Sequence, residues 1–312
     1  PGECPNPMKT CYPYPGRVVT ALRSTMLLLA FSVFIGGCSQ HKINRLRSYS
    51  PVSEPPPAGD NLPAQTPGEL QKMGDFYLAR GEYQTAFMKY DQARRMAGGD
   101  VELRYKMGMA LLMGQAPMEA LKEFEAVLEA DPGHAPAHEA AGSAYLQVKD
   151  YKNARKHLVE AIEIDPESWR AHNWLGIIYD YDKRYEEAIA HYLTALEIDS
   201  GQGSVYNNLG VSNFLSKNYD AAAGNFREAL KHGYTVPKVY NNLGMALAKS
   251  GDFEGARVAF VEGNGEAQGY NNLGCVLLEM GYRRQAIASF EKALSLSPSY
   301  YHRAAANLKS VR

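Results

Sequence analysis

The sequence Val205-Tyr206-Asn207-Asn208-Leu209-Gly210 recurs twice in nearly the same form, as Val239 to Gly244 and as Gly269 to Gly274. Internal repetition is therefore the first feature to follow along this chain. The closing glycine returns every 34 residues, and its last step shortens to 30; these glycines are Gly74, Gly108, Gly142, Gly176, Gly210, Gly244 and Gly274. Seven copies of one unit thus occupy residues 67–300.

Glycine inside a helix costs about 1 kcal/mol relative to alanine, so seven glycines in register indicate a packing constraint. Twelve residues after each glycine the chain carries an alanine: Ala86, Ala120, Ala154, Ala188, Ala222, Ala256 and Ala286. Four residues later it carries an aromatic residue or Leu: Tyr90, Phe124, Leu158, Tyr192, Phe226, Phe260 and Phe290. We expect each glycine to face its alanine across two antiparallel helices, with the larger side chain closing over the contact.

Proline marks the end of the second helix in three units, because it cannot continue a helix. Pro132, Pro166 and Pro298 each follow their glycine by 24 residues. Each unit is therefore predicted to be a helical hairpin, and the fold class to be all-α. This pattern of Leu, Gly, Ala, aromatic and Pro resembles the tetratricopeptide repeat family over residues 67–300. The resemblance implies an α-solenoid of about seven hairpins, wound as a right-handed superhelix whose concave groove holds peptides and protein partners.

The array needs a cap, because the outer face of a terminal repeat is otherwise exposed. Residues 301–312 form an amphipathic stretch that we expect to be this capping helix.

Two repeats depart from the pattern. Asn213 stands where the other copies carry Tyr or Leu, so either it finds a hydrogen-bond partner or the helix turns to present Phe214. The sixth repeat is four residues short, which either bends the groove or is a tolerated deletion.

Residues 1–37 have the features of a signal and pre-sequence region rather than of a repeat. Arg17 and Arg23 precede the ten-residue apolar run from Met26 to Ile35. This run is far shorter than the roughly 20 residues that span a bilayer as a helix. Small residues and then Cys38 follow it, which resembles the bacterial lipoprotein signal and implies lipidation of Cys38. The alternative is an ordinary signal peptide with an incidental cysteine.

Residue 39 is Ser rather than Asp, and by the sorting rule of bacterial lipoproteins this implies the outer membrane, facing the periplasm. Residues 38–66 are rich in Pro and polar residues without an apolar period. Such a segment behaves as an extended, semi-rigid spacer. We expect residues 38–66 to be a tether that joins the lipidated cysteine to the repeats.

The repeated asparagines indicate where a partner binds. If the Leu and Gly of each first helix pack inward, the neighbouring asparagines lie on the concave side. They would form an amide row able to pair with a peptide backbone, beside a mostly apolar stripe. The predicted groove residues are Asn173, Ile177, Asn207, Asn208, Val211, Asn241, Asn242, Met245, Asn271, Asn272 and Cys275. The alternative is that the stripe packs between repeats and the asparagines bond one another across repeats.

The sequence offers little for catalysis. It has no zinc-type Cys pairs, no His-Glu helix motif and no Gly-x-Ser-x-Gly elbow, so we expect no enzyme, catalytic residue, metal site, cofactor or small-molecule substrate. The 33 basic and 34 acidic residues nearly balance, which argues against nucleic acid as a partner. Lys238 is the only well-placed base on the groove, so a clamp for a terminal carboxylate is not expected.

A lipoprotein with this array and this short sixth repeat resembles the TadD-type lipoproteins of tight-adherence (Flp) pilus systems. The resemblance implies a scaffold that helps assemble or localise a secretin or other pilus and secretion components. A type IV pilus secretin pilotin looks similar and is the nearest alternative. The others are an adaptor for cell-envelope enzymes such as peptidoglycan hydrolases, and a lipid-anchored enzyme regulator.

Overall fold

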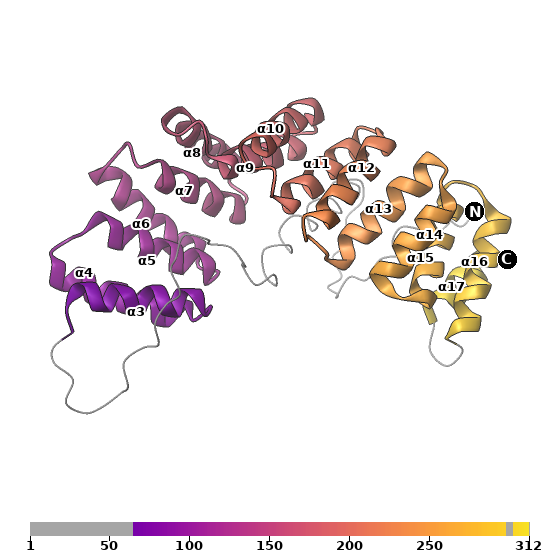
Figure 1. Ribbon diagram of the computed structural model, residues 1–312, viewed down its shortest axis with the longest axis horizontal. Helices are drawn as coiled ribbons and strands as arrows, with labels where there is room; N and C mark the ends of the chain where they lie inside the picture. The colour runs from indigo at the N-terminus through magenta and orange to yellow at the C-terminus, as the bar shows by residue number, and fades with distance from the viewer. Residues whose placement is uncertain (1–64, 298–301, 312) are drawn as a thin grey trace, which may run out of the picture. The chain divides into compact units, whose positions relative to one another are not determined.

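The computed structural model describes residues 65–297 and 302–311, and these residues contain helices and no strand. Residues 1–37, Cys38, Pro298 and most of the predicted tether lie outside this range. The fifteen helices follow one another along the chain (Figure 1), and they are α3 (Pro67–Ala79), α4 (Tyr83–Ala97), α5 (Val101–Met113), α6 (Pro117–Ala130), α7 (Ala135–Gln147), α8 (Tyr151–Ile164), α9 (Trp169–Tyr181), α10 (Tyr185–Ile198), α11 (Gly203–Leu215), α12 (Tyr219–Lys231), α13 (Pro237–Ser250), α14 (Phe253–Asn264), α15 (Glu266–Glu279), α16 (Arg283–Leu296) and α17 (His302–Val311).

The helices pack as successive antiparallel hairpins, which confirms the predicted all-α solenoid of tetratricopeptide-like repeats. The chain divides into two compact units, with the boundary of the helical region between Tyr181 and Asp182. The first unit contains α3 to α9 and the second contains α10 to α17. Within each unit every helix packs on the next one along the chain. The boundary falls in the turn of the fourth repeat, between α9 and α10.

The repeated glycine lies closest to the large side chain that follows it by sixteen residues, an aromatic ring in most of its hairpins. A Cβ placed on Gly108 would lie 2.5 Å from Cε1 of Phe124, and one on Gly74 would lie 2.4 Å from Cε1 of Tyr90. The larger side chain therefore fills the space that the glycine leaves. In the third repeat the branched side chain of Leu158 takes the place of the ring against Gly142. The alanine twelve residues after each glycine is fully buried in all seven repeats.

Local sequence explains where the helices begin and end. Thr66 and Glu69 form a capping box at the start of α3, and Asp150 and Asp252 cap α8 and α14 through their side chains. Helices α6 and α8 end two residues before Pro132 and Pro166, as predicted. The turn between the two helices of a repeat needs one residue with positive φ: Gly81, Gln115, Lys149, Lys183, Lys217, Gly251 and Gly281.

The short sixth repeat is closed by glycines. Only Gly265 separates α14 from α15, and its φ of 81° and ψ of 166° suit glycine alone. A Cβ on Gly269 would lie 2.6 Å from Cγ2 and 2.8 Å from Cα of Val261, and one on Gly263 would lie 2.6 Å from Cβ of Tyr240. The deletion therefore brings backbone close to backbone. This contact is why the hexapeptide begins with Gly269 where the other copies have Val.

Asn213 is buried and donates from Nδ2 to the main-chain oxygen of Leu209, one turn earlier in α11, at 3.0 Å. Of the two expected outcomes, the hydrogen bond is the one observed. Helix α17 packs on α16 and α15, as a capping helix should. Arg283 of α16 donates to the main-chain oxygen of Val311 at the C-terminal end of α17, where helix carbonyls lack intrahelical partners.

Candidate functional site

The first helices of successive repeats in the second unit lie side by side. Helix α11 contacts α13, α13 contacts α15, and α15 contacts α17, in addition to the contacts within hairpins. All the predicted asparagines except Asn173, which is on α9, lie on these helices. We call Asn207, Asn241, Asn242, Asn271, Asn272 and Asn307 the amide ladder.

The amide ladder connects each repeat to the one before it through a repeated hydrogen bond. Nδ2 of Asn242 donates to Oδ1 of Asn207 at 3.3 Å, and Nδ2 of Asn272 donates to Oδ1 of Asn241 at 3.1 Å. In each case the second asparagine of one repeat donates to the first asparagine of the preceding repeat. Asn242 and Asn272 thus bond to asparagines of the preceding repeat, as the alternative interpretation expects.

Helix α17 continues the ladder as if it were the first helix of an eighth repeat. Nδ2 of Asn307 donates to Oδ1 of Asn271 at 3.0 Å and lies 3.5 Å from Sγ of Cys275. Leu308 follows Asn307 as Leu follows Asn in the hexapeptide, but the next residue is Lys309 instead of glycine. The sequence contained this signal in Asn307-Leu308, and the prediction of a plain capping helix missed it.

The ladder is only partly accessible. Within the ladder, Asn207 and Asn271 are 5% and 1% exposed, whereas Asn241, Asn242 and Asn272 are half-buried; Asn208, outside the ladder, is half-buried too. An amide has two donor hydrogens and two acceptor lone pairs, so one ladder bond does not exhaust it. Oδ1 of Asn242 and Oδ1 of Asn272 accept no hydrogen bond from the described residues. The half-buried asparagines are thus the ladder members that a partner could reach.

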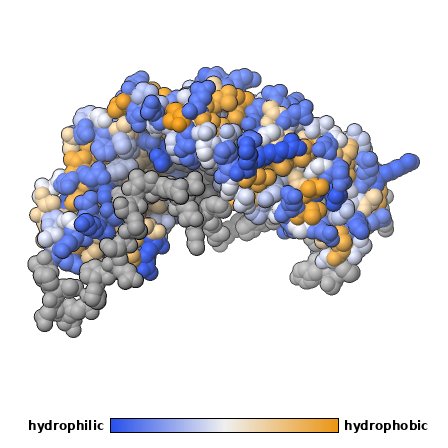
Figure 2. Space-filling view, in the orientation of Figure 1, coloured by the Kyte–Doolittle hydropathy of each residue, from blue (hydrophilic) through white to orange (hydrophobic). Residues whose placement is uncertain are grey.

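The predicted apolar stripe lies mostly inside the packing. Ile177, Val211 and Cys275 are buried, as is Asn173, and only Met245 is half-buried. The polar half of the predicted groove is therefore more accessible than its apolar half. Figure 2 shows apolar residues scattered among polar ones on the visible face instead of gathered into one continuous belt.

The shortened repeat adds two further amides to the ladder. Nδ2 of Asn264 donates to Oδ1 of Asn241 at 2.7 Å and to the main-chain oxygen of Phe260 at 2.9 Å. Nε2 of Gln268 lies 3.3 Å from Oδ1 of Asn264. Oδ1 of Asn241 thus accepts from both Asn264 and Asn272, which ties the junction of α14 and α15 to the first helix of the sixth repeat.

In the first unit, an ion pair links two first helices, and its lysine occupies a repeat position that asparagine holds in the second unit. Nζ of Lys106 lies 2.8 Å from Oδ1 of Asp75, and the Tyr90 hydroxyl donates to the same oxygen at 2.8 Å. Lys106 precedes its glycine by two residues, as Asn242 and Asn272 do. This register shared by Lys106, Asn242 and Asn272 was visible in the sequence, but the ion pair with Asp75 on the neighbouring helix was not predicted.

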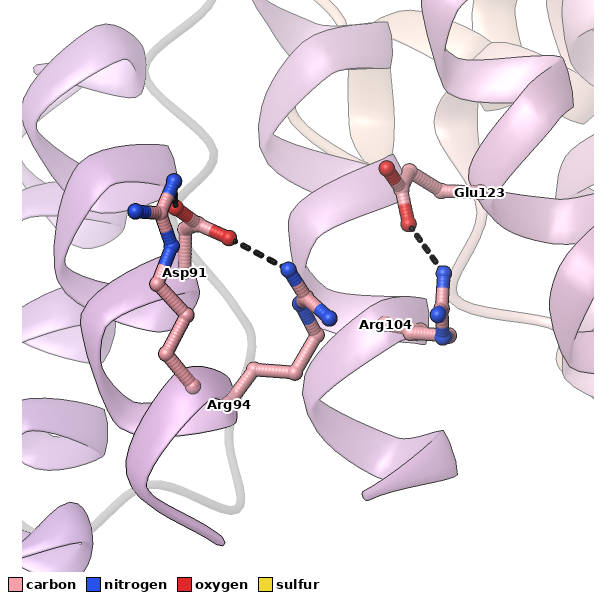
Figure 3. Close-up of polar contacts among 5 residues, drawn as sticks. Asp91, Arg94, Arg104 and Glu123 are labelled. Carbon is pink, nitrogen blue, oxygen red and sulfur yellow. Dashed lines mark hydrogen bonds and ion pairs between the residues drawn. The ribbon is translucent and has the colours of Figure 1, made fainter. Parts of the chain in front are cut away.

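Ion pairs also link residues within each of the first two hairpins. In Figure 3, Arg94 reaches toward Asp91 of the same helix at 2.8 Å, and Arg104 of α5 reaches toward Glu123 of α6 at 3.4 Å. Arg94 and Arg95 together hold the pKa of Asp91 below its usual value, against the opposing effect of its burial. These pairs link side chains within each hairpin.

Glu139 and Lys238 are among the titratable groups of the first helices whose pKa values are shifted. Burial raises the pKa of Glu139, although Ser168 Oγ donates to its carboxylate at 2.6 Å. Burial lowers the pKa of Lys238 to about 8, so this lysine loses its proton more readily than an exposed lysine does.

Within residues 65–297 and 302–311, no group of three His, Cys, Asp or Glu side chains is arranged to hold a metal ion. No helix in the same residues has the length and apolar character needed to cross a bilayer.

Comparison with known proteins identifies the repeats. Tetratricopeptide repeat profiles match residues 72–135, 139–203 and 216–263, and a second tetratricopeptide repeat profile matches residues 267–300. The inactive TPR repeat-containing thioredoxin TTL3 of Arabidopsis thaliana is 32% identical over 91 residues. That alignment covers 29% of this chain and only 13% of the Arabidopsis protein.

Two solved structures share the fold. A tetratricopeptide repeat protein from Parabacteroides merdae superposes with a TM-score of 0.53 at 18% identity, covering 78% of this chain and 98% of that one. The pilF protein of Pseudomonas aeruginosa gives 0.52 at 22% identity, with 67% and 95% covered. The chain therefore belongs to the tetratricopeptide repeat family, and its repeats form a scaffold for protein–protein interaction.

Proposed function

We propose that this protein is an outer-membrane lipoprotein, anchored through Cys38 and facing the periplasm, that assembles a pilus or secretion machine. Its clients are components of that machine, with the secretin first among them. The signal region before Cys38 and the short sixth repeat support this function, because both are features of the TadD-type lipoproteins that the chain resembles. The family membership supports the scaffold role, and the amide ladder supplies the surface.

The half-buried amides carry the proposal for how a partner is held. Asn242 and Asn272 each use one hydrogen for the ladder and keep a carbonyl oxygen that no described residue uses. An extended peptide offers alternating N–H and C=O groups, which an amide can accept from and donate to. A partner segment lying across α11, α13 and α15 would therefore be held through its backbone, with little demand on its side chains.

The anchor is tested by changing Cys38 to Ser in the full-length chain and separating membranes from soluble protein. Without a thiol there is no acyl acceptor, so we expect the variant in the periplasmic fraction and unlabelled by radioactive palmitate. Retention of the variant in outer membranes after a high-salt wash would rule out the lipid anchor.

The clients are tested by crosslinking the protein in the native envelope and identifying the captured proteins. We expect a secretin or another pilus-assembly component in the wild-type sample and its loss from the double variant Asn242→Ala with Asn272→Ala. The double variant also loses two ladder bonds, each worth about 0.5–1.5 kcal/mol, so its folding is checked by circular dichroism.

The matched control is Asn307→Ala, which removes a buried rung of the same ladder that no partner can touch. Loss of stability without loss of capture in this control shows that the accessible amides act on the partner. Capture of cell-wall hydrolases in place of secretion components would replace the proposed client class. Equal capture by the wild type and the double variant would remove the amide ladder from partner binding.

A further inference from the structure

Each repeat has an edge formed by the turn between its two helices, and an aromatic residue begins the second helix there in most copies. These residues all follow the repeat's glycine by nine positions, and they are Tyr83, Tyr151, Tyr185, Tyr219 and Phe253. Their rings therefore recur at the same place along the edge. What differs between repeats is the residue that the following repeat places against the ring.

At two places the following repeat supplies an aromatic ring. Tyr181, at the end of α9, stacks on Tyr151 with the ring centroids 3.9 Å apart, and burial beside Tyr181 raises the pKa of Tyr151 to about 12. Tyr282, just before α16, packs edge-on against Phe253 at 5.1 Å. Aromatic pairs of these geometries are favourable beyond the area they bury. At these two places the edge therefore accommodates a second aromatic ring beside the ring that begins the second helix.

At two other places the following repeat supplies a small residue, and a hollow lies there instead. A hollow of about 440 Å³ is lined by Tyr83, Phe87, Leu111, Gly114 and Ala116, with further lining from the start of α4. A second hollow of about 350 Å³ is lined by Tyr219 and Ser250 among more polar residues. Ala116 follows Gly108 by eight positions, as Tyr282 follows Gly274. In the first hollow, Ala116 therefore occupies the repeat position that Tyr282 occupies beside Phe253.

We propose that the hollow at Tyr83 is a binding site for an aromatic side chain of a protein partner. The occupant takes the place that Tyr282 takes in the seventh repeat, against the ring of Tyr83 and above Phe87 and Leu111. The volume lies in the range of ligand sites, and the lining combines aromatic and aliphatic groups with a polar rim.

The Tyr219 hollow is the weaker of the two. The ring of Phe214 already packs edge-on against Tyr219 at 5.3 Å, and Lys217, Asn218 and Asp220 make its lining polar. Among the described residues, no other ring packs on Tyr83 as Phe214 packs on Tyr219. It also lies at the turn edge of the first unit, whereas the amide ladder lies on the first helices of the second. The proposal thus adds a second contact surface, and it depends on the proposed function only in assigning the aromatic group to a protein.

The test is an NMR titration of the full-length protein with N-acetyl-tyrosinamide, a free aromatic probe that needs no envelope partner. We expect saturable shifts of the ring resonances of Tyr83 and Phe87 and the methyl resonances of Leu111, in the millimolar range that a small ligand reaches. Ala116→Tyr places a ring in the hollow, as in the seventh repeat, and should weaken the response at least tenfold while the protein stays folded. Ser250→Tyr fills the other hollow and should leave it unchanged.

Tyr83→Ala serves as a second variant, because it removes the stacking surface instead of filling the space, and it should also abolish the response. Shifts that fail to saturate, or that persist undiminished in folded Ala116→Tyr or Tyr83→Ala protein, overturn the site. Because the probe is a single amino-acid derivative, a negative result leaves the amide ladder and the proposed clients untouched. A positive result stands even if crosslinking identifies no secretin.

Discussion

At the scale of single residues, the repeat depends on a close contact between a glycine and a large side chain. A Cβ at Gly108, Gly210, Gly244 or Gly274 would lie 2.5–2.7 Å from a ring carbon of the phenylalanine sixteen residues later. Real Cβ atoms do not approach carbon so closely, and the rings are fully buried, so they cannot move aside. Glycine occupies this position despite its unfavourable helix propensity, because any larger residue would push the two helices of the hairpin apart.

The first prediction concerns Gly108→Ala, which should destabilise the protein by about 1–3 kcal/mol through overpacking against Phe124. Chemical denaturation of the variant measures the change in unfolding free energy. Gly224→Ala is the matched control, because Gly224 is also helical but an added Cβ would meet nothing within 4 Å. The control should gain up to about 1 kcal/mol from improved helix propensity. A loss of stability in Gly224→Ala similar to that in Gly108→Ala would show that the close contact is not the cause.

The second prediction concerns the turn inside each repeat, where Gln115, Lys149, Lys183 and Lys217 have φ values of 62–67°. Side chains other than glycine are strained there, whereas Gly81, Gly251 and Gly281 are not. Lys149→Gly should therefore raise the unfolding free energy by about 0.5–1 kcal/mol, measured by denaturant titration. Lys156→Gly, at an exposed position inside α8, should instead lower it by about 1 kcal/mol. Equal effects of the two changes would contradict the role of backbone strain.

At the scale of helices, side-chain hydrogen bonds fix how neighbouring elements dock. The amide ladder joins first helices of adjacent repeats, and its final rung fastens α17. That rung lies in a buried environment, where a lost hydrogen bond costs more than at the surface because the remaining partner is left unsatisfied. The charge pair of Asp75 and Lys106 plays the corresponding part between α3 and α5.

The third prediction is that Asn307→Ala loosens α17. The change leaves Oδ1 of Asn271 without its donor in a site that is 1% exposed, at a cost of about 1–3 kcal/mol. Hydrogen exchange followed by mass spectrometry should show faster exchange in α17 and in α15. Lys309→Ala, on the exposed side of the same helix, serves as the control and should exchange like the wild type. Unchanged protection of α17 in Asn307→Ala would mean that the rung does not hold the helix.

The fourth prediction concerns pH and the contact between α7 and α8. Nδ1 of His138 and Nδ1 of His157 lie 3.1 Å apart, and Tyr145 stacks on His157. Burial, helped by His138 and Lys156 and opposed by Glu160, lowers the pKa of His157. The unfolded chain therefore takes up a proton at higher pH than the folded chain, so this group stabilises the fold above its unfolded pKa and loses that contribution as the pH falls.

Melting temperatures measured between about pH 7.5 and about pH 5.5 give the test, since histidine titrates in this window. We expect the wild type to lose more stability on acidification than His157→Gln, which cannot charge. Identical pH dependence in the two proteins would show that His157 does not contribute. Lys152→Gln changes the charge elsewhere on α8, and it serves as the control for effects of the helix's total charge on the melting temperature.

At the scale of the whole molecule, the contacts within each compact unit connect helices that are neighbours along the chain. In such arrays stability is close to a sum of repeat and interface contributions. The fifth prediction is that Gly108→Ala acts locally. Hydrogen exchange should accelerate in α5, α6 and the helices that contact them, α4 and α7, while α13 to α16 keep their protection. Uniform acceleration over all repeats would show that the chain unfolds as one cooperative body.

Much of the fold could be predicted from the sequence because helical periodicity and chain breakers are local properties. The 34-residue register gave the hairpins, and Pro132 and Pro166 gave the ends of two helices. The site was less predictable. The sequence placed Asn241 and Asn242 on the right helix, yet it did not distinguish a surface for partners from contacts between repeats. An amide both donates and accepts hydrogen bonds, so the position of an asparagine in a repeat does not determine which group it will bond to.

The sequence by itself determined the number and order of the hairpins, and the positions where only a small residue fits, because these depend on spacing along one chain. Tertiary structure decided what fills the space beside each glycine, which asparagine bonds to which, and where the turn edge is hollow. Those outcomes depend on how each helix is rotated and placed against its neighbours. Side chains that are 16, 31 or 35 residues apart meet only after the whole hairpin has packed, and no local pattern specifies that meeting.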